Sequence, residues 1–279
     1  MDAYGGYGLH GLSKQQNLFL MISQKNRYDF AHFEFIMRGL ARLQERYPSQ
    51  QDSISLSLHC EIADILNAYT KIVQQDTSLT GLSAYSAARP PHSEGLAICI
   101  ASYLAHETNC GNINLRHLSS RKAVEAALMM QSTFPHINFR REVTVGHLLL
   151  DVDAPTGKWA KVIGGTEYLL SGILSEGRKR GMSYNQMAKL LCWNPAQRFS
   201  LPQKGDIAVG YDADLVLVDP NETFVVRASD SESQQGYTPF AGMELRGRVQ
   251  STFLRGQLIY DRHQIVGLPR GRYLRRSQP

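Results

Sequence analysis

Two stretches of this sequence alternate apolar and polar residues with a period of two and then reach a histidine. Residues 54–58 read Ile-Ser-Leu-Ser-Leu and are followed by His59, and residues 112–116 read Asn-Ile-Asn-Leu-Arg and are followed by His117. A period of two is typical of a strand whose two faces meet different surroundings. Side chains at the ends of such strands can reach into a cleft at the rim of a sheet or barrel. The pattern therefore predicts two strands that each deliver an imidazole.

Apolar residues at helical spacing occupy the segments between these strands. The spacing predicts helices over residues 31–47, 62–73, 93–109 and 121–131. Strand-like runs are expected at residues 17–23 and at residues 137–150, the second of which contains His147. Strands that alternate with helices of about a dozen residues indicate parallel strands joined by crossovers, so the predicted fold class is α/β.

The pattern changes in the last third of the chain. Two helices are expected between residues 166 and 193, separated at Gly181, with Ser183 as the N-cap of the second. After residue 204 the chain reads as short strands and turns, and the strands are expected at residues 214–219, 224–227, 249–254 and 257–260. We therefore expect two domains, an α/β domain over residues 1–204 and a small β-sandwich-like domain over residues 205–279.

Composition narrows the class of protein. With 43% hydrophobic and 20% charged residues among 279, the chain reads as globular. It contains no run of about 20 apolar residues, and its first residues do not resemble a signal peptide, so we expect a cytoplasmic protein without a membrane partner. The net charge of +5 is spread along the chain without groove-reading motifs, which argues against a nucleic-acid partner. The cysteines show no C-x-x-C spacing and are expected to be buried thiols; they are Cys60, Cys99, Cys110 and Cys192.

Two histidines at neighbouring strand ends have the arrangement of metal ligands, because imidazole is a preferred ligand of zinc. A histidine of this kind is also common as a hydrogen-bonded core residue, and two ligands do not complete a site. From the residues alone, both interpretations stay open for His59 and His117, and His147 has the same ambiguity. Asp151 and Asp153 are expected to form a turn.

The order and spacing of several blocks resemble the cyclic amidohydrolases of the amidohydrolase superfamily, which include dihydroorotases, allantoinases and hydantoinases. The blocks upstream are residues 57–61 (SLHCE), 88–94 (ARPPHSE), 115–120 (LRHLSS) and 142–147 (EVTVGH). The blocks downstream are residues 193–196 (WNPA), 204–219 (KGDIAVGYDADLVLVD), 237–240 (YTPF) and 252–256 (TFLRG). The resemblance runs from about residue 54 to the C-terminus.

This resemblance implies a (β/α)₈ barrel of the TIM type with a metal centre at the carboxyl ends of its strands, plus a small β domain. It implies that His59 and His117 are the two histidines of one metal position, with zinc as the expected metal, and that His147 lies near the substrate. The implied reaction is hydrolysis of a C–N bond in a cyclic amide or ureide, in which metal-bound hydroxide attacks the ring amide carbon and an aspartate transfers the proton.

The sequence also departs from this family. The family's first barrel strand ends in a His-x-His pair, which this sequence lacks. The family's bridging lysine has no counterpart in register, Lys14 being the nearest. Residues 163–167 follow residues 157–162 at once, where the family has a further strand that bears the catalytic aspartate. The resemblance therefore predicts a barrel of about five strands that is truncated at its N-terminus and has an internal deletion.

Two interpretations of function follow. In the first, the chain is a metal-dependent hydrolase whose missing groups are replaced locally or by a second polypeptide. In the second, which the missing ligands favour, it is a catalytically inactive relative that acts as a subunit or interaction module, or that has no independent function. Because an incomplete barrel leaves unpaired strand edges, we expect a second copy or a partner chain to cover them.

Overall fold

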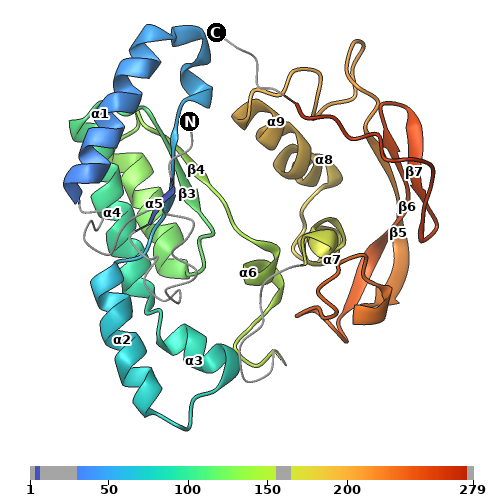
Figure 1. Cartoon of the computed structure of the whole chain (residues 1–279), viewed down its shortest axis with the longest axis horizontal. Helices are drawn as coiled ribbons and strands as arrows, with labels where there is room; N and C mark the ends of the chain where they lie inside the picture. The colour runs from blue at the N-terminus through green and yellow to red at the C-terminus, as the bar shows by residue number, and fades with distance from the viewer. Residues whose placement is uncertain (1–3, 7–29, 155–164, 275–279) are drawn as a thin grey trace. The chain divides into compact units, whose positions relative to one another are not determined.

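The computed structural model describes residues 4–6, 30–154 and 165–274 (Figure 1). The chain forms two compact units, Met1–Lys161 and Val162–Pro279. The sequence had predicted a domain boundary after residue 204 instead. The helices between residues 165 and 204 belong with the second unit because α7 packs against strand β6 there, as the hydrogen bond from Ser171 Oγ to the Gly247 carbonyl shows.

The first unit is built on a parallel sheet in the order β1-β2-β3-β4. Its strands are β1 (Tyr4–Gly6), β2 (Leu56–His59), β3 (Asn112–Arg116) and β4 (Asn138–Arg141). Its helices are α1 (Phe30–Arg46), α2 (Ala63–Gln75), α3 (Gly81–Ala87), α4 (Pro91–Glu107), α5 (Arg121–Thr133) and α6 (Val145–Leu149). A 3₁₀ helix covers Pro48–Ser53. The predicted α/β class is confirmed, and the strands of the sheet are parallel as expected.

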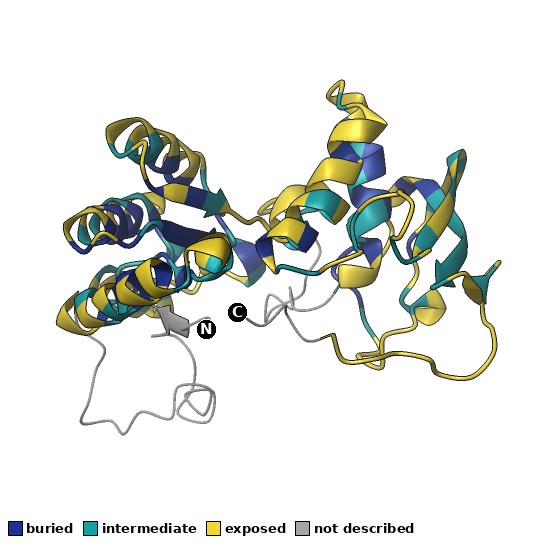
Figure 2. Ribbon diagram, turned by 90° about the horizontal axis from the view of Figure 1, so that it is seen from above, coloured by how far each residue is buried: buried dark blue, intermediate teal, exposed yellow. Residues whose placement is uncertain are grey.

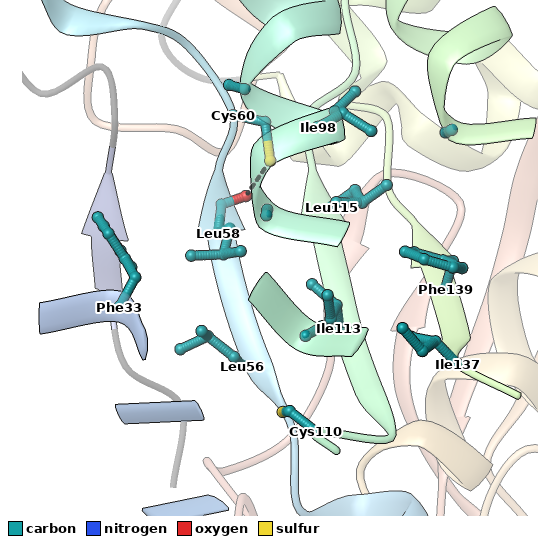
Figure 3. Packing of buried hydrophobic residues seen from close by; sticks show 14 of the residues in the cluster. Phe33, Leu56, Leu58, Cys60, Ile98, Cys110, Ile113, Leu115, Ile137 and Phe139 are labelled. Atoms are coloured by element: carbon teal, nitrogen blue, oxygen red, sulfur yellow. Dashed lines mark hydrogen bonds between the residues drawn. The ribbon is translucent and has the colours of Figure 1, made fainter. Parts of the chain in front are cut away.

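One face of this sheet is apolar and is covered by helices α1, α4 and α5. Leu56 and Leu58 of β2 and Ile113 and Leu115 of β3 are fully buried against these helices (Figure 3). The helices turn their buried positions toward the sheet and their exposed positions away from it (Figure 2). The alternation read from the sequence therefore positions the core, because every second residue of each strand points to the helix side.

The opposite face of the sheet is polar. The Asn114 side chain donates hydrogen bonds to the hydroxyls of Ser55 and Ser57, at 3.0 and 2.9 Å, which ties β3 to β2. Asn112 donates to the Gln51 carbonyl at 2.7 Å. These hydrogen bonds offset part of the free-energy cost of removing the buried side chains from water. The Asn112 Oδ1 atom is buried without a hydrogen-bond partner among the described residues. His59 continues this polar row at the carboxyl end of β2.

The second unit is an antiparallel sheet in the order β5-β6-β7-β8 with helices packed against it. The strands are β5 (Leu215–Val225), β6 (Glu244–Leu254), β7 (Gln257–Asp261) and β8 (Gln264–Ile265). The helices are α7 (Leu169–Lys179), α8 (Tyr184–Ala188) and α9 (Asn194–Arg198). A π-helical turn covers Lys189–Trp193, and two 3₁₀ turns cover Thr166–Tyr168 and Ala228–Asp230.

Ser183 caps α8 as predicted, in a capping box with Gln186. The expectation of separate strands over residues 214–219 and 224–227 was wrong, because β5 continues through Pro220. The ladder between β5 and β6 is irregular between Asp219 and Thr223, where the Asp219 carboxylate accepts a hydrogen bond from the Asn221 backbone N–H at 2.8 Å. The proline and its neighbours form a bulge within one strand, not a reversal of the chain.

The strand expected over residues 137–150 is also corrected. Only Asn138–Arg141 is extended, and the chain then forms the short helix α6. Thr144 starts this helix, because its side chain accepts a hydrogen bond from the His147 backbone N–H as an N-cap. His147 is therefore a helical residue. The strand expected at residues 17–23 and the residue Lys14 lie outside the described part of the chain.

Candidate functional site

The site is built where β2 and β3 end. The two strands are neighbours and parallel, with His59 opposite Arg116 in the ladder. His117 follows directly and has a left-handed backbone with φ of 40°, a conformation that ends the strand. The next residue, Leu118, donates its backbone N–H to the Glu142 carbonyl at 2.8 Å and fixes the turn.

The two imidazoles meet at this edge. The ring centroids of His59 and His117 are 4.5 Å apart and the ring planes are tilted by 50°. His59 Nδ1 and His117 Nε2 are hydrogen-bonded to each other. The prediction that the two strands deliver their histidines to one place is therefore confirmed.

Both rings are held in the neutral form. Burial, as the largest cause, and the neighbouring His59 together lower the pKa of His117 to about 4. Burial also lowers the pKa of His59, with the Arg116 guanidinium as a second cause. At neutral pH two uncharged imidazoles therefore face each other, which is the protonation state that a metal ion requires.

His147 lies beside this pair without joining it. Its ring centroid is 6.3 Å from that of His117, and its Nδ1 atom is 3.0 Å from the Thr144 hydroxyl. Burial lowers the pKa of His147 as well. A third imidazole thus stands near the other two, attached to α6 and not to the sheet.

Two carboxyl groups belong to segments next to the histidine pair, Glu61 two residues after His59 and Glu94 hydrogen-bonded to Ser119, and sequence reasoning did not assign either of them a role. Burial, as the largest cause, and the nearby Glu94 raise the pKa of Glu61 to about 7, although Arg89 opposes the rise. Burial also raises the pKa of Glu94, although hydrogen bonds from Ser120 and Ser119 oppose this. The only sequence signal was their position in the two blocks around residues 57–61 and 88–94.

The donor atoms suit a metal ion only in part. Two neutral imidazole nitrogens that face each other are ligands that zinc prefers, whereas a catalytic zinc usually takes three protein ligands and a water. Within residues 4–6, 30–154 and 165–274, no three histidine, cysteine, aspartate or glutamate side chains are grouped so that they could hold a metal ion. His59 and His117 therefore fit as two ligands of a metal, and the described residues do not complete the set.

The other polar candidates have structural roles or lie elsewhere. The Asp151 carboxylate accepts the Asp153 backbone N–H at 3.1 Å, so these residues form the turn that was expected. All four cysteines are free thiols. Cys60 and Cys110 are buried as expected, but Cys99 is only partly buried, and the expectation was wrong for Cys192, which is exposed within the π-helical turn Lys189–Trp193.

None of the helices in the described part of the chain is both long and apolar enough to span a membrane.

Comparisons with known proteins place these features in a family context. The model of the amidohydrolase family matches residues 147–259. The chain is 30% identical over 254 residues to an allantoinase of Enterococcus faecalis, covering 74% of this chain and 56% of that protein. It is 29% identical over 276 residues to an allantoinase of Desulfitobacterium hafniense, covering 81% of this chain and 60% of that protein.

Among solved structures, the chain is similar to the dihydropyrimidinase from Brevibacillus agri, with a TM-score of 0.73 at 21% sequence identity. That likeness covers 95% of this chain and 65% of the other, and at this identity it concerns the fold alone. The chain thus spans somewhat more than half the length of the curated relatives named above.

Proposed function

Since the chain belongs to the amidohydrolase superfamily, among its cyclic amidohydrolases, we propose that it acts as a metal-dependent hydrolase of a C–N bond in the ring of a cyclic amide or ureide. The observation that carries the proposal is the contact between His59 and His117 at the carboxyl ends of two adjacent parallel strands. The similarity to two allantoinases supports the substrate class.

The sheet of the first unit is, in this proposal, an arc of a (β/α)₈ barrel. Three features support it: the parallel order β1-β2-β3-β4, the helices on one face, and the histidines at the carboxyl ends of the strands. The fold likeness to a dihydropyrimidinase supports it too. Strands that close the barrel and ligands that complete the metal site would come from residues outside the described part of the chain or from a second polypeptide.

In this proposal, different residues of the chain bind the metal and contact the substrate. His59 and His117 would bind zinc through neutral imidazole nitrogens, since burial keeps the pKa of both below its usual value. A zinc ion bound there would polarise the ring carbonyl and lower the pKa of a water. His147 would contact the substrate from α6, where the Thr144 hydroxyl beside Nδ1 holds its ring.

The expected substrates share one group, a ring amide flanked by nitrogen. The names of the relatives indicate allantoin, and the name of the structural neighbour indicates dihydropyrimidines. Both rings contain a carbonyl that a metal can polarise and a C–N bond that opens to a carboxylate and an amide or urea nitrogen. The described residues do not distinguish between the two rings.

The test is ring opening by zinc-loaded protein. Allantoin and dihydrouracil are incubated with the protein, and the ring-opened products are quantified by chromatography. Wild type should turn over at least one of them, and His59→Ala and His117→Ala should each lose activity by at least about 10²-fold, because each removes a metal ligand. His92→Ala, which removes an exposed histidine that packs on Tyr69, should retain activity. If the zinc-loaded wild type leaves both rings intact, the proposal is wrong and the catalytically inactive interpretation is supported.

A further inference from the structure

The first turn of α4 contacts both loops that carry the histidine pair. Ser93 and Glu94 lie just after Pro91, the first residue of this helix, and their exposed fractions are only 1% and 5%. The hydrogen-bond partners of the Ser93 and Glu94 side chains are Ile62, Ser119 and Ser120. These hydrogen bonds thus go to the backbone and side chains that follow His59 and His117.

Ser93 holds the loop after β2. Its hydroxyl accepts a hydrogen bond from the Ile62 backbone N–H at 2.8 Å and lies 3.4 Å from the Ile62 carbonyl, to which it can donate. Ile62 is the N-cap residue of α2 and stands three positions after His59. One buried hydroxyl therefore fixes the point at which the chain leaves the strand end and enters the next helix.

Glu94 holds the loop after β3. Its Oε1 atom accepts the Ser119 backbone N–H at 2.8 Å, and its Oε2 atom accepts the hydroxyls of Ser120 and Ser119 at 2.7 and 3.2 Å. The Ser120 hydroxyl also accepts the Ala123 backbone N–H at 3.1 Å and thereby caps α5. Hydrogen bonds to a charged acceptor are about twice as strong as neutral ones, so this carboxylate is a firm anchor two residues after His117.

The helix that presents these two side chains is rigidly supported. The middle of α4 is packed in the core, where Ala97, Ile98 and Ala101 are fully buried. Because α4 is fixed and binds both loops, it sets the distance between the residues that follow β2 and those that follow β3. His117 needs this support because it stands outside the ladder in a left-handed conformation.

We propose that Ser93 and Glu94 are positioning residues that hold the loops after β2 and β3 on one helix, so that the rings of His59 and His117 face each other. The proposal rests on the proposed function for the meaning of the pair as metal ligands, but the ring geometry itself is a property of the metal-free chain. Groups that orient metal ligands commonly change metal affinity by about 10- to 100-fold when they are removed.

The variants are Ser93→Ala and Glu94→Gln, with Ser102→Ala as the matched control. Ser102 is a fully buried serine of the same helix, but its hydroxyl donates at 2.7 Å to the Ile98 carbonyl of its own helix. The control thus loses a buried hydroxyl without releasing either loop. Should Glu94→Gln fail to fold, Ser119→Ala replaces it, since this change removes one donor to the carboxylate from an exposed loop position.

Two measurements are made on the full chain. Zinc affinity is determined by competition with a chelating dye. The contact of the two rings in metal-free protein is followed by NMR, from imidazole ¹⁵N shifts and cross-peaks between the rings, assigned with His59→Ala and His117→Ala. Ser93→Ala and Glu94→Gln should weaken zinc binding by about 10- to 100-fold and reduce the cross-peaks between the rings, whereas Ser102→Ala should leave both unchanged.

Unchanged zinc affinity and unchanged cross-peaks in folded Ser93→Ala and Glu94→Gln proteins would overturn the proposal. So would losses that Ser102→Ala matches, because the effect would then reflect stability alone. If wild type binds no zinc, the proposed function fails while the NMR comparison still decides whether these residues position the rings.

Discussion

Acidification should destabilise the metal-free protein through His117. In the folded chain burial, with the neighbouring His59 as the second cause, lowers the pKa of this imidazole from 6.5 to about 4, whereas an unfolded chain keeps the ordinary value. Between these two values the unfolded state binds more protons than the folded state, so stability falls as the pH falls. The contribution of a neutral His117 is fully present above pH 6.5 and is lost as the pH approaches 4.

The magnitude follows from the difference in pKa. About 2.5 pH units at about 1.36 kcal/mol each give a full loss of about 3.4 kcal/mol. At pH 4, where His117 of the folded chain is half protonated, the loss relative to pH 7.5 is about 3 kcal/mol. Because a domain of ordinary size is stable by about 5–15 kcal/mol, this should be readily visible.

The assay is urea unfolding followed by circular dichroism in the presence of a chelator, at several pH values from 7.5 to 4. Carboxyl groups also titrate in this range, so wild type is compared with His117→Gln, which keeps them. The difference in free energy of unfolding between the two proteins should shift by about 3 kcal/mol in favour of the variant as the pH falls. Parallel pH profiles of the two proteins would refute the reasoning, because they would mean that the His117 ring takes up a proton equally well when folded.

Further predictions concern the two cores. Leu58→Ala should destabilise the first unit by about 2–5 kcal/mol, because it opens a cavity among fully buried neighbours. Ile72→Ala, at a position that is 62% exposed, should change stability by less than about 0.5 kcal/mol. Urea unfolding measures the free energy of unfolding of both variants. Gly247→Ala should destabilise the second unit, because the added Cβ would lie 2.8 Å from Leu174 at a φ of +90°. Gly242→Ala is the control, because Gly242 has a φ of +87° with open space around it, so this change adds backbone strain without a clash. Gly247→Ala should lose more stability than Gly242→Ala in thermal unfolding. Equal losses would show that the clash with Leu174 does not contribute.

The arrangement of the histidine pair could be predicted from the sequence because it depends on local pattern. Period-two alternation fixes which face of β2 and β3 is apolar, and parallel strands place their carboxyl ends at one edge. His59 and His117 therefore lie side by side as expected, with their ring centroids 4.5 Å apart. The helices α1, α2, α4 and α5 were predicted from apolar residues at helical spacing, although in α2 only Leu66 of that stripe is buried and Ile72 is 62% exposed.

The parts that were missed depend on contacts distant in sequence or on a single side chain. His147 was placed on a strand because Val143 and Val145 alternate with polar residues, and the N-cap at Thr144 was not weighed. Ser93 and Glu94 carry no sign in the sequence that they bind loops 25 to 31 positions away. The expectation that a partner covers the edges of the sheet remains a prediction, as does the cytoplasmic location.

His59 and His117 are proposed to hold a metal ion together, and equilibrium zinc binding by the full chain measures this. Wild type and His92→Ala are predicted to bind zinc with the same affinity and a stoichiometry near one at this site, while His59→Ala and His117→Ala each lose that binding. If zinc binding persists unchanged in both His59→Ala and His117→Ala, or if the wild-type chain binds no zinc, these two histidines do not form a metal site.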